Sequence, residues 1–258
     1  MNGFILKCIA LITMMIDHTG VVLQPLFSTM ILRCVGRAAF PIYAFFVAEG
    51  CRKTRSMGRY ALRLSLFAIL SEIPFDMVLL NVKYRTEWPS ILFFDFSDQN
   101  IFCTLLLGAL AVWLVQIFRQ KGWPLFMALI LDLLVISLGA FGKTDYGAAG
   151  VLFILLLYLA PNKPIQALCV AVMSFYFYIL SWINWGGSDL WPQIMTAFTG
   201  LSFYNRALFA GGCVSAVLIC FYNGKRGPRA KWFFYAAYPV HLLILLGVWF
   251  FVVSPRLR

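Results

Sequence analysis

The chain has 258 residues, 62% of them hydrophobic, 17% aromatic and only 12% charged, and its mean hydropathy is +0.85. Because soluble domains carry about 25% charged residues, this composition excludes an ordinary soluble protein. It predicts a polytopic membrane protein, with residues 1–258 forming a single integral-membrane domain. The formal net charge of +11 lies mostly in short segments between apolar runs. This pattern favours membrane lipids or a phosphorylated ligand as partners and argues against nucleic acid.

Nine apolar segments, most of them near the ~20 residues that cross a bilayer, predict an all-α bundle of transmembrane helices. Eight to ten spans fit the sequence. The nine segments cover residues 4–24, 30–50, 60–80, 100–118, 124–141, 146–160, 164–183, 207–222 and 232–252. The stretch 184–206 fits a re-entrant or interfacial segment. Lysine and arginine crowd into alternate loops, which predicts a cytoplasmic N-terminus.

Three pairs of ionisable residues interrupt the first three apolar segments. They are Asp17 and His18, Arg33 and Arg37, and Glu72 and Asp76. The members of the last two pairs are four residues apart and therefore share one face of a helix. The predicted orientation places all six residues in the outer half of the membrane. A charged group is costly there and is a functional hypothesis by default. The alternative is a buried ion-pair network that only joins helices.

Five more polar residues fall at the outer half or the centre of the predicted bundle. Asn100 and Thr104 open the fourth segment, Asp145 and Tyr146 open the sixth, and His241 lies in the ninth. The two histidines are the side chains suited to take a proton near neutral pH during acyl transfer. A hydrogen-bonded core histidine is the alternative, and it is the stronger alternative for His241.

Basic residues and prolines complete the set of candidate site residues. Arg52, Arg55, Arg59 and Arg63 crowd a predicted cytoplasmic loop and the helix start after it. They fit the positive-inside signal, or they hold the phosphates of a cofactor such as coenzyme A. Pro41, Pro74 and Pro239 each remove a backbone donor and free the carbonyl four residues earlier. Kinked helices around a hydrated cavity are therefore expected.

Several motifs that follow one another along nearly the whole chain resemble the TraX family. They include Met15-Ile16-Asp17-His18, Gly36-Arg37-x-Ala39-Phe40-Pro41, Ser71-Glu72-Ile73-Pro74-Phe75-Asp76, Asn100-Ile101-Phe102-x-Thr104, Asp145-Tyr146-Gly147 and Tyr238-Pro239-x-His241. The resemblance implies a multi-pass acetyltransferase of the bacterial cytoplasmic (inner) membrane. It also implies acetyl-CoA as the acyl donor, and the pilin N-terminus as the acceptor of the family's named member.

The main hypothesis is therefore an acyltransferase that moves an acetyl or other acyl group from acyl-CoA to a hydroxyl or amine. The acceptor would be a peptide N-terminus, a glycan or a lipid-linked molecule. His18 is the first choice as base and His241 the second. Arg33 or Arg37 would stabilise the oxyanion, and Asp17 would balance an arginine. The remaining acidic residues would orient the base, pair with the arginines or bind an acceptor amine.

Two other classes stay open from the sequence. A transporter or flippase for an anionic or lipid-linked solute would use the same buried charges as its pathway, although the chain lacks an evident repeat. A structural membrane subunit would use them only to join helices. No metal is expected, and a homo-oligomer is compatible with the sequence.

Overall fold

The computed structural model describes residues 1–80, 97–180 and 203–257, and within them the chain is helical. An isolated bridge between Gln99 and Thr144 is the one extended pairing of this part of the chain. Most of the expected segment at 184–206 lies outside the described residues. The elements are α1 (Gly3–Leu23), α2 (Met30–Gly36), α3 (Ala39–Lys53), α4 (Met57–Phe75), η1 (Asp76–Leu80), α6 (Ile101–Lys121), α7 (Leu125–Phe141), α8 (Gly147–Leu159), α9 (Lys163–Tyr178), α11 (Phe203–Cys220), α12 (Lys231–Val248), η3 (Trp249–Val253) and α13 (Ser254–Leu257).

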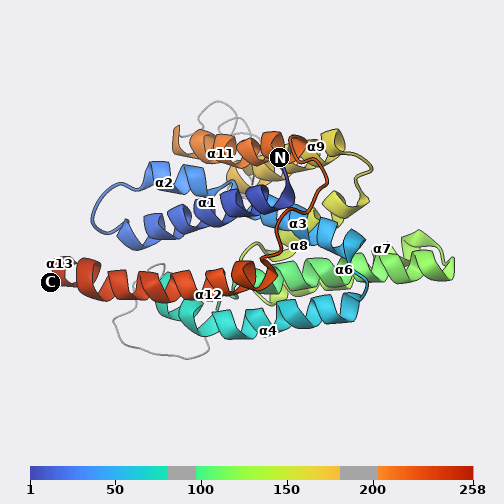
Figure 1. The fold of residues 1–258 in the computed structure, drawn as a ribbon, viewed down its shortest axis with the longest axis horizontal. Coiled ribbons are helices and arrows are strands. Elements are labelled where there is room, and N and C mark those ends of the chain that lie inside the picture. The colour runs from blue at the N-terminus through green and yellow to red at the C-terminus, as the bar shows by residue number, and fades with distance from the viewer. Residues whose placement is uncertain (81–96, 181–202, 258) are drawn as a thin grey trace, which may run out of the picture.

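A helix occupies each of the nine expected segments, and most of the helices run along the long axis of the bundle (Figure 1). Five stretches of the described chain are long and apolar enough to cross a membrane. They are Gly3–Leu23, Met30–Lys53, Ile101–Lys121, Phe203–Cys220 and Lys231–Arg256. The helices α7 and α8 are apolar but shorter. The all-α transmembrane bundle predicted from the sequence is therefore confirmed.

Asparagine and serine side chains begin four of the helices. Asn2 accepts from the N–H of Ile5 at 3.0 Å, and Asn162 accepts from that of Ile165 at 3.0 Å. Asn100 opens α6 and Ser56 opens α4 in the same way. A helix start leaves backbone donors without an intrahelical partner, and these caps satisfy one donor each.

The second apolar segment is broken, which differs from the single helix expected over 30–50. Helix α2 ends at Gly36 and α3 begins at Ala39. Pro41 therefore lies in the first turn of α3, where a helix has no intrahelical partner for its N–H groups. The expectation that Pro41 frees a carbonyl inside a continuous helix is wrong. Pro74 and Pro239 do lie inside helices, α4 and α12 respectively.

Two glycines permit helices to approach closely. A Cβ at Gly36 would clash with the side chain of Asp17, and a Cβ at Gly211 would clash with the backbone carbonyl of Cys34. The first contact brings α2 against α1, and the second brings α11 against α2. Both contacts position α2, which carries Arg33 and is followed directly by Arg37.

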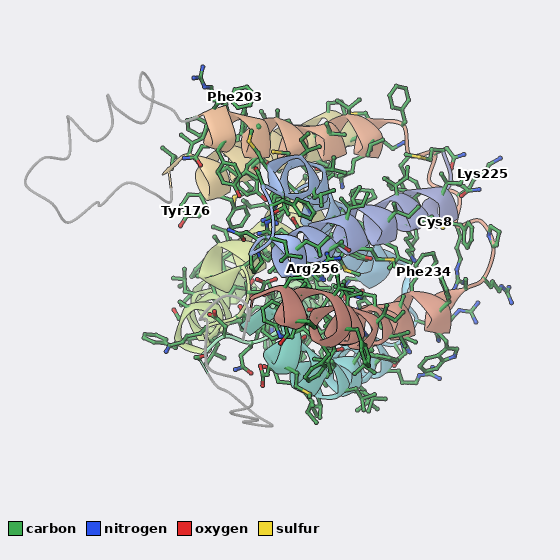
Figure 2. The ribbon with its side chains drawn as sticks, turned by 90° about the vertical axis from the view of Figure 1, so that its left-hand side faces the viewer. Cys8, Tyr176, Phe203, Lys225, Phe234 and Arg256 are labelled. Carbon is green, nitrogen blue, oxygen red and sulfur yellow. The ribbon has the colours of Figure 1, made fainter. Side chains whose placement is uncertain are left out.

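Loops predicted to share one side of the membrane meet at one end of the bundle, which we call the basic end. It holds the start of α1, the end of α3 and residues 221–231. The Met1 ammonium donates to the Phe221 carbonyl at 2.8 Å, and the N–H of Gly3 donates to the Lys225 carbonyl at 2.8 Å. Figure 2 shows Lys225 at this end and Phe203 toward the other.

Candidate functional site: a basic pocket that ends at Tyr238

Asp17 joins two arginines in a buried ion cluster. Arg33 Nη1 donates to Asp17 Oδ2 at 2.7 Å, and Arg37 Nη2 donates to both carboxylate oxygens. Arg37 also donates from Nε to the carbonyl of Arg33 at 3.2 Å, and its guanidinium lies 5.9 Å from the ring centre of Tyr178. The expected pairing of Asp17 with the arginines is therefore present. Two guanidiniums share one carboxylate, so the cluster carries a formal charge of +1.

His18 and His241 form a pair between α1 and α12. His18 Nδ1 lies 2.6 Å from His241 Nε2, and the two rings lie edge to edge, with 4.9 Å between centroids and 20° between planes. His241 Nδ1 lies 3.0 Å from the carbonyl oxygen of Ala237, one turn earlier in α12. His241 is 4% exposed, whereas His18 is only half-buried. The sequence treated these histidines as rival candidates, but the fold makes them neighbours.

Glu72 and Asn100 join α4 to α6 at the end of the bundle opposite the basic end. The Asn100 side-chain amide donates to Glu72 Oε2 and, at 2.8 Å, to the carbonyl of Ala68. The backbone N–H of Asn100 also donates to Glu72 Oε2, at 3.3 Å. Glu72 is 5% exposed, and its Oε1 has no hydrogen-bond partner among the described residues. Asp76 is buried one turn further on, as the first residue of η1.

The remaining outer-half candidates lie where α6 meets α8. The buried hydroxyl of Thr104 accepts from the backbone N–H of Tyr146 at 3.4 Å. The ring of Tyr146 stacks on Phe40 with 3.5 Å between centroids. Asp145 is exposed, and its backbone N–H donates to the carbonyl of Gln99 at 2.9 Å. Asn100 and Thr104 thus fix the start of α8 relative to α4 and α6.

A cavity of about 820 Å³ opens at the basic end and runs between α1, α3, α4, α6 and α12. Its volume is typical of small-molecule sites, which occupy roughly 300–1,000 Å³. The described residues give it seven cationic side chains and one carboxylate, Glu49. The cations are Lys7, Lys53, Arg55, Arg63, Arg226, Arg229 and Lys231. Glu49 pairs with Arg52 and Lys53 at 2.8 Å each, so the lining keeps a strong positive charge.

The deep part of the cavity is apolar and aromatic, and it ends at Tyr238. Phe102 and Tyr238 line it, with their rings edge to face at 5.4 Å. The ring of Tyr238 also contacts His241 at 5.4 Å and His18 at 6.0 Å between centroids. Met14, one turn before His18 in α1, lines the same cavity. Tyr238 therefore separates the cavity from the two imidazoles.

The four arginines assigned to a cofactor from the sequence divide into two groups. Arg55 and Arg63 line the cavity. Arg52 instead donates to the carbonyls of Leu157 at 2.8 Å and Tyr158 at 2.6 Å, at the end of α8. Arg59 is exposed and lies outside the lining that the described residues form. Only half of the predicted basic group faces the cavity.

Sequence reasoning missed several residues of this cavity. Lys7, Lys53, Arg226, Arg229 and Lys231 were not among the candidate site residues, although most of them belong to the positively charged loops that indicate membrane orientation. The sequence did contain a signal for these residues. Two loops carry clustered positive charge, which predicts that both lie on the same side of the membrane and therefore at the same end of the bundle. The role of Tyr238 had no comparable signal beyond its place in the motif with Pro239 and His241.

Comparisons with known proteins place the whole chain in one group. Residues 2–249 match the family described as TraX protein. The chain is 27% identical over 256 residues to the "Probable fimbrial assembly protein FimC, serogroup H1" of Dichelobacter nodosus, and the alignment covers 97% of each protein. No solved structure matches the chain.

Proposed function

Because the chain belongs to the TraX family, we propose that it is an acyl-CoA-dependent acyltransferase of the bacterial inner membrane. It moves an acetyl or other acyl group to a hydroxyl or amine of a membrane-associated or extracytoplasmic acceptor. The observation that carries this proposal is the cavity, which begins among cations at the basic end and ends at Tyr238, against two histidines.

The donor half of the proposal follows from the cavity lining. Coenzyme A carries several phosphates on its nucleotide and a narrow, mostly uncharged arm that ends in the thioester. Arginine and lysine at the mouth match the phosphates, and the aromatic interior suits the arm. The basic end then faces the cytoplasm, where acyl-CoA is found, as the distribution of positive charge favours. The thioester comes to rest near Tyr238.

The chemical half of the proposal uses the groups behind Tyr238. A histidine takes the proton of the acceptor as its oxygen or nitrogen attacks the thioester carbonyl. The carbonyl oxygen becomes negative in that step. The excess positive charge of the Asp17–Arg33–Arg37 cluster, one residue along α1 from His18, favours this negative charge. Glu72, Asp76 and Asp145 lie at the opposite end of the bundle, where an acceptor from outside the membrane would arrive.

Two observations bear on the class of acceptor. They are the name of the Dichelobacter relative and the carboxylates at the end of the bundle opposite the basic end. The name of the Dichelobacter protein supports a peptide acceptor connected with fimbrial assembly, and a carboxylate end suits the amine of a peptide N-terminus. Glycans and lipid-linked molecules are the other acceptor classes.

Donor binding tests the first half of the proposal. We expect acetyl-CoA to raise the melting temperature of the purified protein more than an adenine nucleotide without the pantetheine arm. Arg55→Gln should weaken acetyl-CoA binding by about three- to tenfold, because it removes an exposed phosphate partner at the cavity mouth. Arg59→Gln is the matched control, since Arg59 is also exposed and lies four residues further on, but outside the lining. Equal affinities of the two variants would contradict the proposed phosphate site.

Group transfer tests the second half. Membranes that contain the protein are incubated with acetyl-CoA labelled in the acetyl group, and mass spectrometry follows the label into other molecules. We expect His18→Ala to reduce transfer by at least about 100-fold, as loss of a general base does, and Arg37→Ala to do the same through loss of charge stabilisation. Undiminished transfer by both folded variants would refute the mechanism. Movement of a solute without covalent transfer would support a transporter instead.

A further inference from the structure

The hydrogen bonds around the two histidines determine which ring nitrogen carries the proton. The carbonyl of Ala237 can only accept, so His241 Nδ1, 3.0 Å away, must donate to it. A neutral imidazole has one N–H, and Nε2 of His241 is therefore an acceptor. Its partner at 2.6 Å, Nδ1 of His18, must then donate. The opposite assignment would direct a lone pair of His241 Nδ1 at the carbonyl oxygen, which is repulsive.

We propose that His241 is a positioning residue that holds His18 as the Nδ1–H tautomer. This leaves Nε2 of His18 unprotonated and able to act as the base. The inference deepens the acyltransferase proposal above and rests on it for the reaction, but the tautomers follow from the contacts alone. In catalytic sites, the partner on one imidazole nitrogen commonly sets the chemistry of the other.

The partners of the four ring nitrogens agree with this division of roles. His241 is 4% exposed and has both ring nitrogens occupied, one by Ala237 and one by His18. His18 is half-buried, and among the described residues its Nε2 has no recorded partner. Only His18 therefore has a ring nitrogen available to a substrate, while His241 supports it from within the bundle.

The pair also gives the proton a defined route. The acceptor's oxygen or nitrogen forms a bond to the thioester carbon while its proton passes to Nε2 of His18. The positive charge that results is shared, because the Nδ1 proton of His18 can move along the 2.6 Å contact to Nε2 of His241. When the carbon–sulfur bond breaks, the proton returns through His18 to the coenzyme A thiolate. Acyl product and free thiol result, and both histidines are neutral again.

The chain allows a direct test because it contains only two histidines. Protein labelled with ¹⁵N-histidine, carrying a purification tag without histidine, is placed in lipid nanodiscs for NMR at a pH where both rings are neutral. We expect both imidazoles to show a protonated Nδ1 and an unprotonated Nε2. In His241→Gln, His18 is the only labelled residue, and it should keep the Nδ1–H tautomer because the glutamine oxygen can accept in place of Nε2. In His241→Leu it should lose this preference.

Kinetic measurements then distinguish a positioning role of His241 from a role in folding alone. With coenzyme A release followed at saturating acetyl-CoA, we expect His241→Leu to lower kcat by at least about 100-fold. The KM for acetyl-CoA should change by less than about twofold, since the cavity mouth is untouched. His241→Gln should recover at least about tenfold of the lost kcat. A protonated Nε2 on His18 in the wild type, or equal kcat values for the two variants, would overturn the inference. If no variant and no wild-type protein transfers an acyl group, the proposed function fails, and the NMR spectra alone decide the tautomers.

Discussion

Asp17 is the residue on which the charge balance of the outer half depends. Its single carboxylate contacts two guanidiniums, and all three side chains are largely withdrawn from solvent. An arginine keeps its charge at any ordinary pH, so the cluster cannot relax by losing a proton. Removing one partner from a buried ion pair leaves an uncompensated charge and costs far more than the pair contributes to stability.

Asp17→Asn should therefore lower the free energy of unfolding by about 3–5 kcal/mol, because two buried guanidiniums lose their counter-charge. The double variant Asp17→Asn with Arg33→Gln restores the original formal charge of +1 and should recover part of this loss. Chemical or thermal unfolding in detergent measures both effects. A matched control is Glu49→Gln, which breaks the more exposed pairs at 2.8 Å with Arg52 and Lys53 and should cost under about 1 kcal/mol. A double variant no more stable than the single variant would contradict the charge argument.

For individual residues, the sequence predicts which side chains are polar and buried, but not which of them pair with one another. Spacing of four residues places Arg33 and Arg37 on one face, and the structure joins both to Asp17. Adjacent residues in a helix point in directions about 100° apart. Asp17 and His18 accordingly turn to α2 and to α12, respectively. The pairing of His18 with His241 links residues 223 positions apart, and no local pattern encodes such a contact.

Among the helices, α2 is the element whose packing matters most for the site. It is short, it carries Arg33 and is followed directly by Arg37, and α1 and α11 enclose it through Gly36 and Gly211. The sequence predicted one helix over 30–50 because this segment is mostly apolar, although Gly36 and Pro41 lie on either side of the break that the structure shows. Residues 37–38 form a turn between α2 and α3, in which the N–H of Arg37 donates to the Cys34 carbonyl at 3.3 Å and that of Ala38 to the Val35 carbonyl at 3.4 Å.

Gly211→Ala tests the approach of α11 to α2. The added methyl would clash with the Cys34 carbonyl, which belongs to a helix backbone and cannot rotate away. We expect a loss of about 1–3 kcal/mol in the free energy of unfolding, as for other overpacked contacts. Gly247→Ala is the control, because a Cβ there meets no atom within 4 Å, and the better helix propensity of alanine should leave stability unchanged or slightly raised. Similar melting temperatures for the two variants would show that the helices separate at no cost.

Over the whole molecule, the alternation of charged loops correctly predicted which loops share an end. Lys53 donates to the Tyr222 hydroxyl at 3.1 Å and to the Gly224 carbonyl at 3.2 Å, and Arg52 reaches the end of α8. Three loops of the same predicted side therefore touch. The cavity could not be predicted in the same way, because its lining combines residues from five helices whose relative rotation depends on packing between distant segments.

The position of α12 has a consequence for biosynthesis. This helix supplies Tyr238 and His241, while α1, near the other end of the chain, supplies Lys7, Met14 and His18. A chain emerging from the ribosome thus inserts one wall of the cavity long before the other exists. Neither the cavity nor the histidine pair can form until α12 has docked against α1. A chain that ended before α12 would lack Tyr238 and His241, so that the deep end of the cavity and the histidine pair report completed assembly.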